Sequence, residues 1–371
     1  MKLPGTDDSS TLLHDLRSDT RSVGILTFHR CINYGSYWQA RCLAEGVHAR
    51  GHRVMLLDHE SPRVTRAEWR SALQPTLPVR ASAEDRRHYG AKLRKFLCAF
   101  DALPLSPGFD LVDPLEMPHV DTVLVGSDEV WNLRHPWYGG ASIFFGQGLN
   151  AECVAAYAAS FGSYDADAGL DGYWQDQLRR FDMIAVRDAN SRRLVAEAIG
   201  RDPALVLDPC LQFPPAPDAA VAVPEGRYAL VYGHGMPDTF TDAARAWASS
   251  RGIRLVSIGY RNDWADEQWL DAGPHDFAAA MAGAEAVLTN FFHGCVFALL
   301  NDRPFACATS PYRMNKVRDL TEMVGAERHL LVPGAPIDLA AILDAPLPPA
   351  IGTRIATMRD QSNAYLDKVL G

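Results

Sequence analysis

The residues best suited to chemistry lie in a short stretch, NFFHG, at positions 290–294. Its histidine, His293, is of the residue type that most readily gains or loses a proton near neutral pH. An apolar run ends at Thr289, and a second one follows from Cys295 to Leu300. If the first run is a strand and the second a helix, His293 lies at a strand's carboxyl end and over a helix amino terminus, where anions bind. The stretch predicts an active site, although a histidine in such a loop can also be an ordinary hydrogen-bonded residue.

A second polar cluster, GSDEVWN at 126–132, follows the apolar run DTVLV at 121–125. Asp128 could orient a sugar hydroxyl or act as a base, and it could equally cap the next helix. Trp131 offers a flat face on which a sugar ring could lie. With Ser127 beside Asp128, the cluster is a candidate loop for binding a sugar, which would be the acceptor if the enzyme transfers a group to it.

The short apolar run MIAV at 183–186 leads directly to Arg187. Its guanidinium group is always charged and matches the geometry of a carboxylate or a phosphate. Arg187 is therefore a candidate anion-binding residue, unless it pairs within its own domain with Asp188 or Glu197.

Apolar runs and helical patterns alternate along the chain, and these elements must position the polar residues. SVGILTF at 22–28 and RVMLL at 53–57 have the composition of buried parallel strands, with a helical pattern at 37–50 between them. Asn33 and Gly35 fall where the first strand meets that helix, and a glycine there lets the backbone approach a ligand. The stretch lacks the full glycine-rich dinucleotide fingerprint, so nicotinamide or flavin binding is not predicted.

Two such sets of strands and helices, separated by the proline-rich stretch FPPAP at 213–217, predict an α/β fold with two Rossmann-like domains. The expected arrangement is GT-B-like, with the active site in the interdomain cleft. The predicted parts are a polar N-terminal tail (1–21), an N-terminal, acceptor-side domain (22–212), a linker (213–226), a C-terminal domain that carries the His293 loop (227–345) and a C-terminal helical segment (346–371).

Composition narrows the range of functions. With 371 residues, 47% of them hydrophobic, the chain exceeds the usual size of one domain. A formal net charge of −9 argues against general nucleic-acid binding. The seven cysteines show no CxxC pair and no metal-ligand spacing, so we expect reduced thiols, a cytoplasmic location, and neither metal nor cofactor. The polar first residues are unlike a signal peptide, and no apolar window is long enough to span a membrane.

Seven stretches, found in one order between about residues 22 and 331, resemble the polysaccharide pyruvyl transferase family. They are GILTFHRCINYGSYWQARCL, VLVGSDEVWN, AAYAASFG, AVRDANS, LVLDPCLQF, PHDFAAAMAGAEAVLTNFFHGCVFALLNDRPF and NKVRDLTEMVGAERHL. The resemblance implies an enzyme that transfers pyruvate from phosphoenolpyruvate to a sugar, often as a ketal across two hydroxyls, and releases phosphate.

The resemblance also implies roles for charged residues. The catalytic histidine of the family corresponds to His293, and the arginine of its VRD-type motif corresponds to Arg187 as a contact to the donor. A basic residue downstream corresponds to Lys316, with Arg313 as the alternative. The chemistry agrees, because phosphoenolpyruvate carries a carboxylate and a phosphate, and protonation of its methylene carbon needs a positioned acid.

Residues of two loops complete the predicted donor site. Asn33 and Gly35 match the NxG loop of the family. Asn290 and Gly294 lie in the histidine loop, and Gly294 marks the amide end of the following helix. The GSDxVWN loop of the family matches the candidate acceptor-binding cluster described above.

One position departs from the family pattern. Members commonly carry Arg or Ser two residues before the histidine, whereas this chain has Phe291. An arginine there would contact the donor, and Arg313 or Arg318 could replace it. Two other functions therefore stay open: a GT-B-like glycosyltransferase that uses a nucleotide sugar, and a catalytically weak relative that binds a sugar or a partner protein. The identity of the acceptor, a homo-oligomeric state and peripheral contact with a lipid-linked acceptor also stay open.

Overall fold

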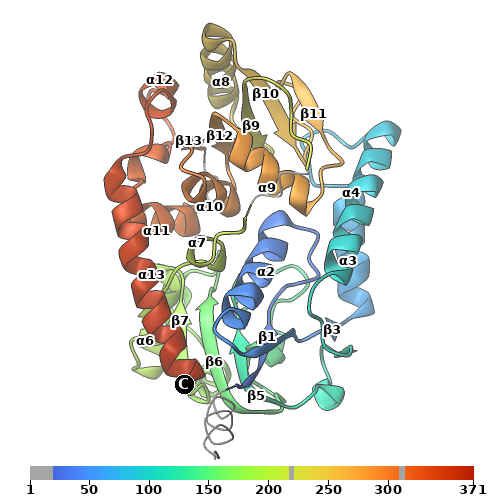
Figure 1. Ribbon diagram of the computed structural model, residues 1–371, viewed down its shortest axis with the longest axis vertical. Helices are drawn as coiled ribbons and strands as arrows, with labels where there is room; N and C mark the ends of the chain where they lie inside the picture. The colour runs from blue at the N-terminus through green and yellow to red at the C-terminus, as the bar shows by residue number, and fades with distance from the viewer. Residues whose placement is uncertain (1–19, 217–220, 309–313) are drawn as a thin grey trace, which may run out of the picture.

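The computed structural model describes residues 20–216, 221–308 and 314–371. In the described part of the N-terminal half, six parallel strands form one sheet in the order β2-β1-β5-β6-β7-β8 (Figure 1). The last four residues of β1 are all buried, as expected for a continuous apolar run covered on both faces. The strands are β1 (Ser22–Leu26), β2 (Arg53–Leu56), β5 (Val120–Val125), β6 (Ala151–Ala159), β7 (Met183–Val186) and β8 (Ala204–Leu205).

Helices connect these strands, and polar caps set where several of them begin. Asn33 Oδ1 accepts hydrogen bonds from the amides of Gly35 and Ser36 at 2.9 and 3.3 Å, which starts the first helix. Asp188 caps another in the same way by accepting from Ser191 N at 2.7 Å. The helices are α2 (Tyr34–His48), α3 (Pro62–Leu73), α4 (Ala83–Asp101), α5 (Gly172–Arg179), α6 (Ala189–Ile199) and α7 (Pro209–Gln212), and a small parallel pair is formed by β3 (His59–Glu60) and β4 (Phe109–Asp110).

The C-terminal half contains a second parallel sheet, in the order β11-β10-β9-β12-β13. Its strands are β9 (Tyr228–Tyr232), β10 (Arg254–Ile258), β11 (Glu267–Trp269), β12 (Ala286–Thr289) and β13 (Phe305–Cys307). Its helices are α8 (Asp238–Arg251), α9 (Pro274–Gly283), α10 (Phe292–Leu300), α11 (Met314–Val324) and α12 (Leu339–Leu343). The two sheets lie one above the other along the long axis of the molecule (Figure 1).

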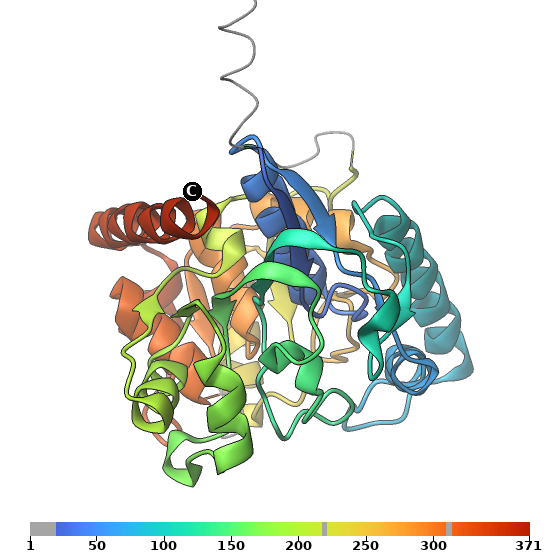
Figure 2. The ribbon, with the colours of Figure 1, turned by 90° about the horizontal axis from the view of Figure 1, so that it is seen from below.

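Two long helices tie the halves together at opposite sides of the molecule (Figure 2). The C-terminal helix α13 (Pro349–Leu370) runs back along the N-terminal half, where Tyr365 Oη donates to the Ala156 carbonyl at 2.7 Å. On the other side, α4 reaches the C-terminal half, where Lys92 Nζ donates to the Gly259 carbonyl at 3.1 Å. These contacts hold the relative position of the two halves.

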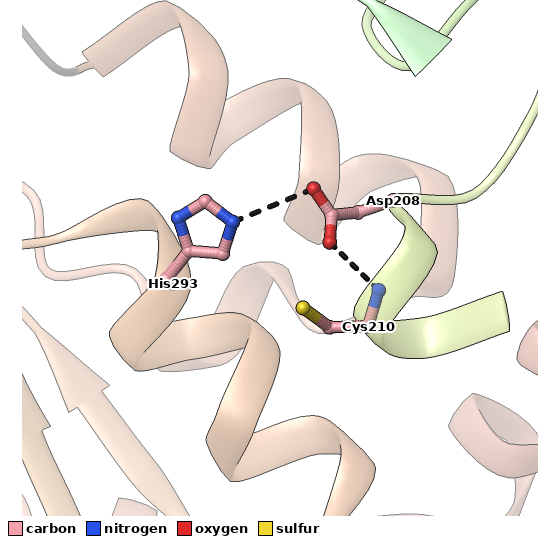
Figure 3. Close-up of side chains that lie close together, drawn as sticks. All are labelled: Asp208, Cys210 and His293. Carbon is pink, nitrogen blue, oxygen red and sulfur yellow. Dashed lines mark hydrogen bonds and ion pairs between the residues drawn. The ribbon is translucent and has the colours of Figure 1, made fainter. Parts of the chain in front are cut away.

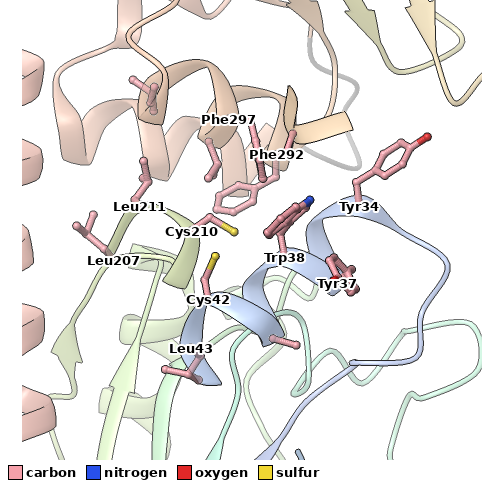
Figure 4. Close-up of a cluster of buried hydrophobic side chains, with 14 of the residues drawn as sticks. Tyr34, Tyr37, Trp38, Cys42, Leu43, Leu207, Cys210, Leu211, Phe292 and Phe297 are labelled. Carbon is pink, nitrogen blue, oxygen red and sulfur yellow. The ribbon is translucent and has the colours of Figure 1, made fainter. Parts of the chain in front are cut away.

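One hydrophobic cluster fills the junction between α2, α7 and α10 (Figure 4). Trp38 and Cys42 come from α2, Leu211 comes from α7, and Phe297 comes from α10. All four side chains are buried. Because the three helices share one core, the residues at their amino ends are held in fixed relation to one another.

The structure confirms the predicted fold class, an α/β fold with two Rossmann-like, GT-B-like halves. The main local difference is at helix starts, because α2 and α10 begin three residues earlier than the apolar patterns indicated. Gly35 and His293 therefore lie inside first helical turns rather than in loops. The seven cysteines form no disulfide. In the described ranges, every helix is too short or too polar to cross a bilayer.

Candidate active site

A cavity of about 270 Å³ lies between the two halves, at the carboxyl ends of both sheets. From the N-terminal half, Asn33, Asp128 and Arg187 line it. From the C-terminal half, His293 and Lys316 line it. The predicted interdomain cleft thus brings together five of the residues selected from the sequence.

His293 lies in the first turn of α10 and is 8% exposed. Its Nε2 atom is 3.5 Å from Asp208 Oδ2, an ion-pair distance that is longer than a good hydrogen bond. Its Nδ1 atom faces the backbone of Gly35, where an added Cβ atom would lie 1.9 Å away. The imidazole is therefore held between a carboxylate and the first turn of α2, with Nδ1 on the side away from the carboxylate.

Asp208 is a candidate site residue that the sequence did not indicate. It follows a short apolar run and caps α7, with Oδ1 accepting from Cys210 N at 3.0 Å (Figure 3). Burial by itself would raise the pKa of Asp208, but the nearby His293 and Arg187 outweigh it and lower that pKa well below its ordinary value. The signal was the same as for Asp128, an acidic residue that follows closely on an apolar run.

Arg187 joins two buried carboxylates. Nη1 donates to Asp208 Oδ2 at 2.8 Å, and Nη2 donates to Asp128 Oδ1 at 3.1 Å. The guanidinium also stacks 4.6 Å from the centre of the Phe292 ring, and its buried Nε has no hydrogen-bond partner among the described residues. Arg187 therefore does pair within its own half of the chain, but not with the two partners that the sequence suggested. Asp188 caps α6 instead, and Glu197 pairs with Arg193.

Asp128 lies at the centre of this network rather than at a helix start. Its Oδ2 accepts from Ser36 Oγ at 2.7 Å, and its backbone adopts a φ of 71° that few side chains other than Asp or Asn tolerate. Burial favours the neutral acid, but Arg187 and His293 outweigh it and lower the pKa of Asp128. Of the two alternatives for Asp128, the helix cap is therefore wrong, and the residue lines the cavity.

Lys316 lines the cavity from α11 and forms an ion pair with Glu129. Glu129 Oε2 also accepts from Asn132 Nδ2 at 2.8 Å. Burial alone would raise the pKa of Glu129, but Lys316 lowers it. Both permanent cations of the cavity thus already face a carboxylate, so the site carries no excess of fixed positive charge in the described residues. Arg313, the alternative to Lys316, lies outside the described residues.

Two predicted acceptor contacts are corrected by the structure. Trp131 is fully buried among Phe145, Phe161 and Phe181, and its Nε1 donates to the Phe144 carbonyl at 2.7 Å. The ring has no free face for a sugar.

Ser127 is fully buried as well, and its Oγ donates to Gln39 Oε1 at 2.5 Å. Its carbonyl accepts from Thr27 Oγ1 at 2.9 Å. Ser127 therefore joins the loops after β1 and β5 and is not available to an acceptor.

Two predicted donor contacts also have structural roles. The Gly294 amide donates to the Phe291 carbonyl within the first turn of α10, and a Cβ atom there would lie 2.1 Å from Thr289 Oγ1. Asn290 is buried, and its Nδ2 donates to the His234 carbonyl at 2.8 Å. Neither residue lines the cavity. Of the four residues predicted in these two loops, Asn33 lines the cavity, and Gly35 contacts the His293 imidazole.

Phe291 forms part of an aromatic wall in the cavity. Its ring meets those of Tyr232, His234 and Tyr260 edge to face, with centroids 4.9 to 5.5 Å apart. Phe291 therefore adds apolar surface and no charge at a position where the family described above commonly carries Arg or Ser.

The fold also brings together three groups that could ligate a metal, although their spacing in the sequence did not indicate it. Donor atoms of Asp208, Cys210 and His293 lie within 4.8 Å of one another (Figure 3). The set suits a metal poorly. Asp208 already binds the Arg187 cation, and burial raises the pKa of the Cys210 thiol, which keeps it protonated. We therefore assign the carboxylate to the imidazole and the guanidinium.

Comparison with known proteins adds the following findings. A family model described as polysaccharide pyruvyl transferase matches residues 33–310. No curated protein matches the chain. Among solved structures, the chain is similar to the glycosyltransferase SsfS6 from Streptomyces sp. SF2575, which was solved in complex with thymidine diphosphate. The sequence identity is 12%, the match covers 93% of this chain and 96% of that one, and the TM-score is 0.42. It is also similar to UDP-GlcNAc 2-epimerase from Methanocaldococcus jannaschii, at 11% identity, 94% and 92% coverage and a TM-score of 0.44. Likeness at this level carries no functional argument, and the fold assignment rests on the two parallel sheets.

Proposed function

Because the chain belongs to the polysaccharide pyruvyl transferase family, we propose that it transfers the pyruvyl group of phosphoenolpyruvate to a sugar hydroxyl or diol of a glycan precursor and releases phosphate. The observation that carries the proposal is the meeting of His293, Arg187 and Lys316 in one cavity between the two halves. The donor is a small molecule with three groups to recognise: a carboxylate, a phosphate and an enol carbon that must be protonated.

Positioning of the donor falls to the two permanent cations. Arg187 is held by two buried carboxylates and therefore stays in place. Lys316 is the partner that we assign to the phosphate, and Glu129 keeps a hydrogen bond from Asn132 when the lysine turns to the donor. A phosphate that takes Lys316 from Glu129 leaves this buried carboxylate with the hydrogen bond from Asn132 alone, and we expect the loss of the ion pair to reduce the affinity for the donor.

Proton transfer to the donor falls to His293. Ionised Asp208 orients the ring through Nε2 and stabilises the charge that the ring carries with a second proton. Nδ1 is then the atom that delivers a proton to the methylene carbon. The adjacent carbon becomes electrophilic and is attacked by the acceptor hydroxyl. General acid catalysis of this kind is worth about 10²- to 10⁴-fold in rate.

The test is incubation of the protein with phosphoenolpyruvate and a panel of sugar nucleotides, lipid-linked sugars and methyl glycosides. Phosphate release and the mass of the acceptor are measured. Acceptor-dependent phosphate release with a pyruvylated product supports the proposal. Release of a nucleotide from a sugar nucleotide without consumption of phosphoenolpyruvate would favour the glycosyltransferase alternative. If neither substrate reacts and titration with phosphoenolpyruvate gives no heat, the result would favour a catalytically weak relative that binds a sugar. The uncharged Phe291 side chain, in place of Arg or Ser, would agree with that outcome.

A further inference from the structure

A second cavity of about 430 Å³ lies in the N-terminal half beside the active-site cavity. Residues of α3, of the C-terminal end of α4 and of β3 line it. Glu68 of α3 lines both cavities. The two cavities therefore adjoin at the Glu68 side chain.

The second cavity combines a flat apolar face with polar groups held in place. Trp69 is 43% exposed there, whereas most large aromatic side chains of the protein are buried. Arg30 is clamped by Asp58 through two hydrogen bonds of 2.5 and 2.6 Å, which neutralise its charge and fix its remaining donors. Ser61 and Thr65 add hydroxyl groups. Arg66 and Glu60 add one charge of each sign to the lining. With its charges balanced and a flat aromatic face, this lining suits a neutral, hydroxylated ring better than a small anion.

Glu68 differs from the other carboxylates of the active-site cavity. Asp128 pairs with Arg187, and Glu129 pairs with Lys316. Glu68 instead accepts from neutral donors, namely Trp137 Nε1 at 2.6 Å and the Ile32 amide at 3.1 Å, and no cation contacts it among the described residues.

The protonation behaviour of Glu68 follows from these surroundings. Burial raises the pKa of Glu68, which makes it a better proton acceptor than the two paired carboxylates. Among the described residues, the titratable group in contact with Glu68 is the Cys31 thiol, which in turn contacts the Tyr138 hydroxyl. Burial raises the pKa of both, so they stay neutral around pH 7. Charge near Glu68 therefore changes mainly through Glu68 itself.

Building on the function proposed above, we propose that the acceptor sugar binds in this second cavity with its ring on Trp69, and that Glu68 takes the proton of the attacking hydroxyl. The hydroxyl oxygen bonds to C2 of phosphoenolpyruvate, its proton passes to Glu68, and the electron pair of the C2–C3 double bond takes a proton from His293. For a ketal, a second hydroxyl then bonds to C2 as the C2–O bond to phosphate breaks. The second hydroxyl proton returns to His293, and the departing phosphate takes the proton from Glu68.

The binding part is tested without turnover. Methyl glycosides of glucose, galactose, mannose and N-acetylglucosamine are titrated at millimolar concentration against the wild type, Trp69→Ala and Tyr173→Ala, with saturation-transfer NMR as readout. Tyr173 is a matched control, since it is 47% exposed but lies outside both cavities. We expect at least one glycoside to bind, with affinity at least about fivefold lower in Trp69→Ala and unchanged in the control. No binding to the wild type, or equal binding to Trp69→Ala, would overturn the placement of the acceptor.

The catalytic part is tested by phosphate release from phosphoenolpyruvate with the acceptor that reacts. Glu68→Gln should lower kcat by about 10²-fold or more, leave the KM for phosphoenolpyruvate nearly unchanged and remove the acidic limb of the kcat profile against pH. If this variant does not fold, Glu68→Asp should lower kcat yet keep the acidic limb. Wild-type kcat and an unchanged pH profile would refute the role of Glu68 while the transferase function stands. A wild type that never consumes phosphoenolpyruvate refutes the proposed function and the role of Glu68 together, and glycoside binding still decides the acceptor cavity.

Discussion

Gly35 and His293 come from opposite halves of the chain, yet a Cβ atom on Gly35 would lie 1.9 Å from Nδ1 of His293. The first turn of α2 thus forms one side of the imidazole site, and Asp208 forms the other. Glycine is required at residue 35 because the ring occupies the space of a side chain, whereas its backbone conformation is an ordinary helical one.

Gly35→Ala should disable the site while the fold stays intact. The added methyl group must push the imidazole away from its position, and a displacement of about 1 Å can cost about 10²-fold in turnover. Gly172→Ala is the matched control, because Gly172 also begins a helix and has open space around its Cα. Phosphate-release kinetics and circular dichroism measure the two effects. Full activity of Gly35→Ala would mean that the ring position is not critical.

His293→Ala should lower turnover of phosphoenolpyruvate by about 10²- to 10⁴-fold and leave donor binding largely intact, since Arg187 and Lys316 remain. Calorimetry gives the binding and phosphate release gives the rate. His48→Ala serves as the control, because this histidine is exposed at the end of α2. Unchanged turnover of His293→Ala would remove the imidazole from the mechanism.

Asp208→Asn should reduce both activity and stability. Asparagine still caps α7, but the charge shared by His293 and Arg187 is lost, and breaking a buried ion pair costs about 3–5 kcal/mol. Because the pKa of Asp208 is lowered in the folded state, its contribution is present at neutral pH and disappears as the pH falls through the folded-state pKa.

The measurement for this variant is urea unfolding at pH 7 and at several lower pH values. The difference between wild type and Asp208→Asn should shrink toward acid. Asp202→Asn, which removes an exposed carboxylate paired with Arg192, should change stability little at any pH. A difference for Asp208→Asn that does not depend on pH would contradict the assigned ionisation.

Trp131→Ala should lower the free energy of unfolding. Because the ring is buried, we do not expect it to contact the acceptor. Removing a fully buried tryptophan costs about 3–5 kcal/mol, which urea unfolding detects. The milder Trp131→Phe variant should keep the wild-type KM for the acceptor. A raised KM in Trp131→Phe with unchanged stability would restore this ring as a sugar contact.

Lys92→Met should flatten the dependence of stability on pH in the alkaline range. Burial among Tyr34, Phe96 and Tyr260 lowers the pKa of Lys92 to about 7, against 10.5 for an exposed lysine. Between these values the unfolded chain binds more protons than the folded one, so this residue makes stability rise with pH.

We therefore expect the free energy of unfolding of Lys92→Met, relative to wild type, to fall by a few kcal/mol between pH 7 and about pH 10. Urea unfolding at several pH values measures it. Lys95→Met is the control, since Lys95 lies one turn away on α4 and is 44% exposed. A constant difference between Lys92→Met and wild type would mean that the buried lysine does not lose its proton in this range.

The sequence by itself was enough for the type and order of the elements that carry the site. Continuous apolar runs and helical periodicity predicted both parallel sheets, because these patterns reflect local burial and chain geometry. They placed Asp128, Arg187 and His293 at strand ends that share one edge of their sheets, and the family likeness indicated the same histidine.

The tertiary structure decided which of these residues meet and what each one contacts. It joined Asp208 to His293, paired both cavity cations with carboxylates, and buried Trp131 while Trp69 stayed exposed. None of this follows from local pattern. The partner of a side chain depends on how α2, α7 and α10 pack around their shared core, and that packing depends on contacts between residues far apart in the chain.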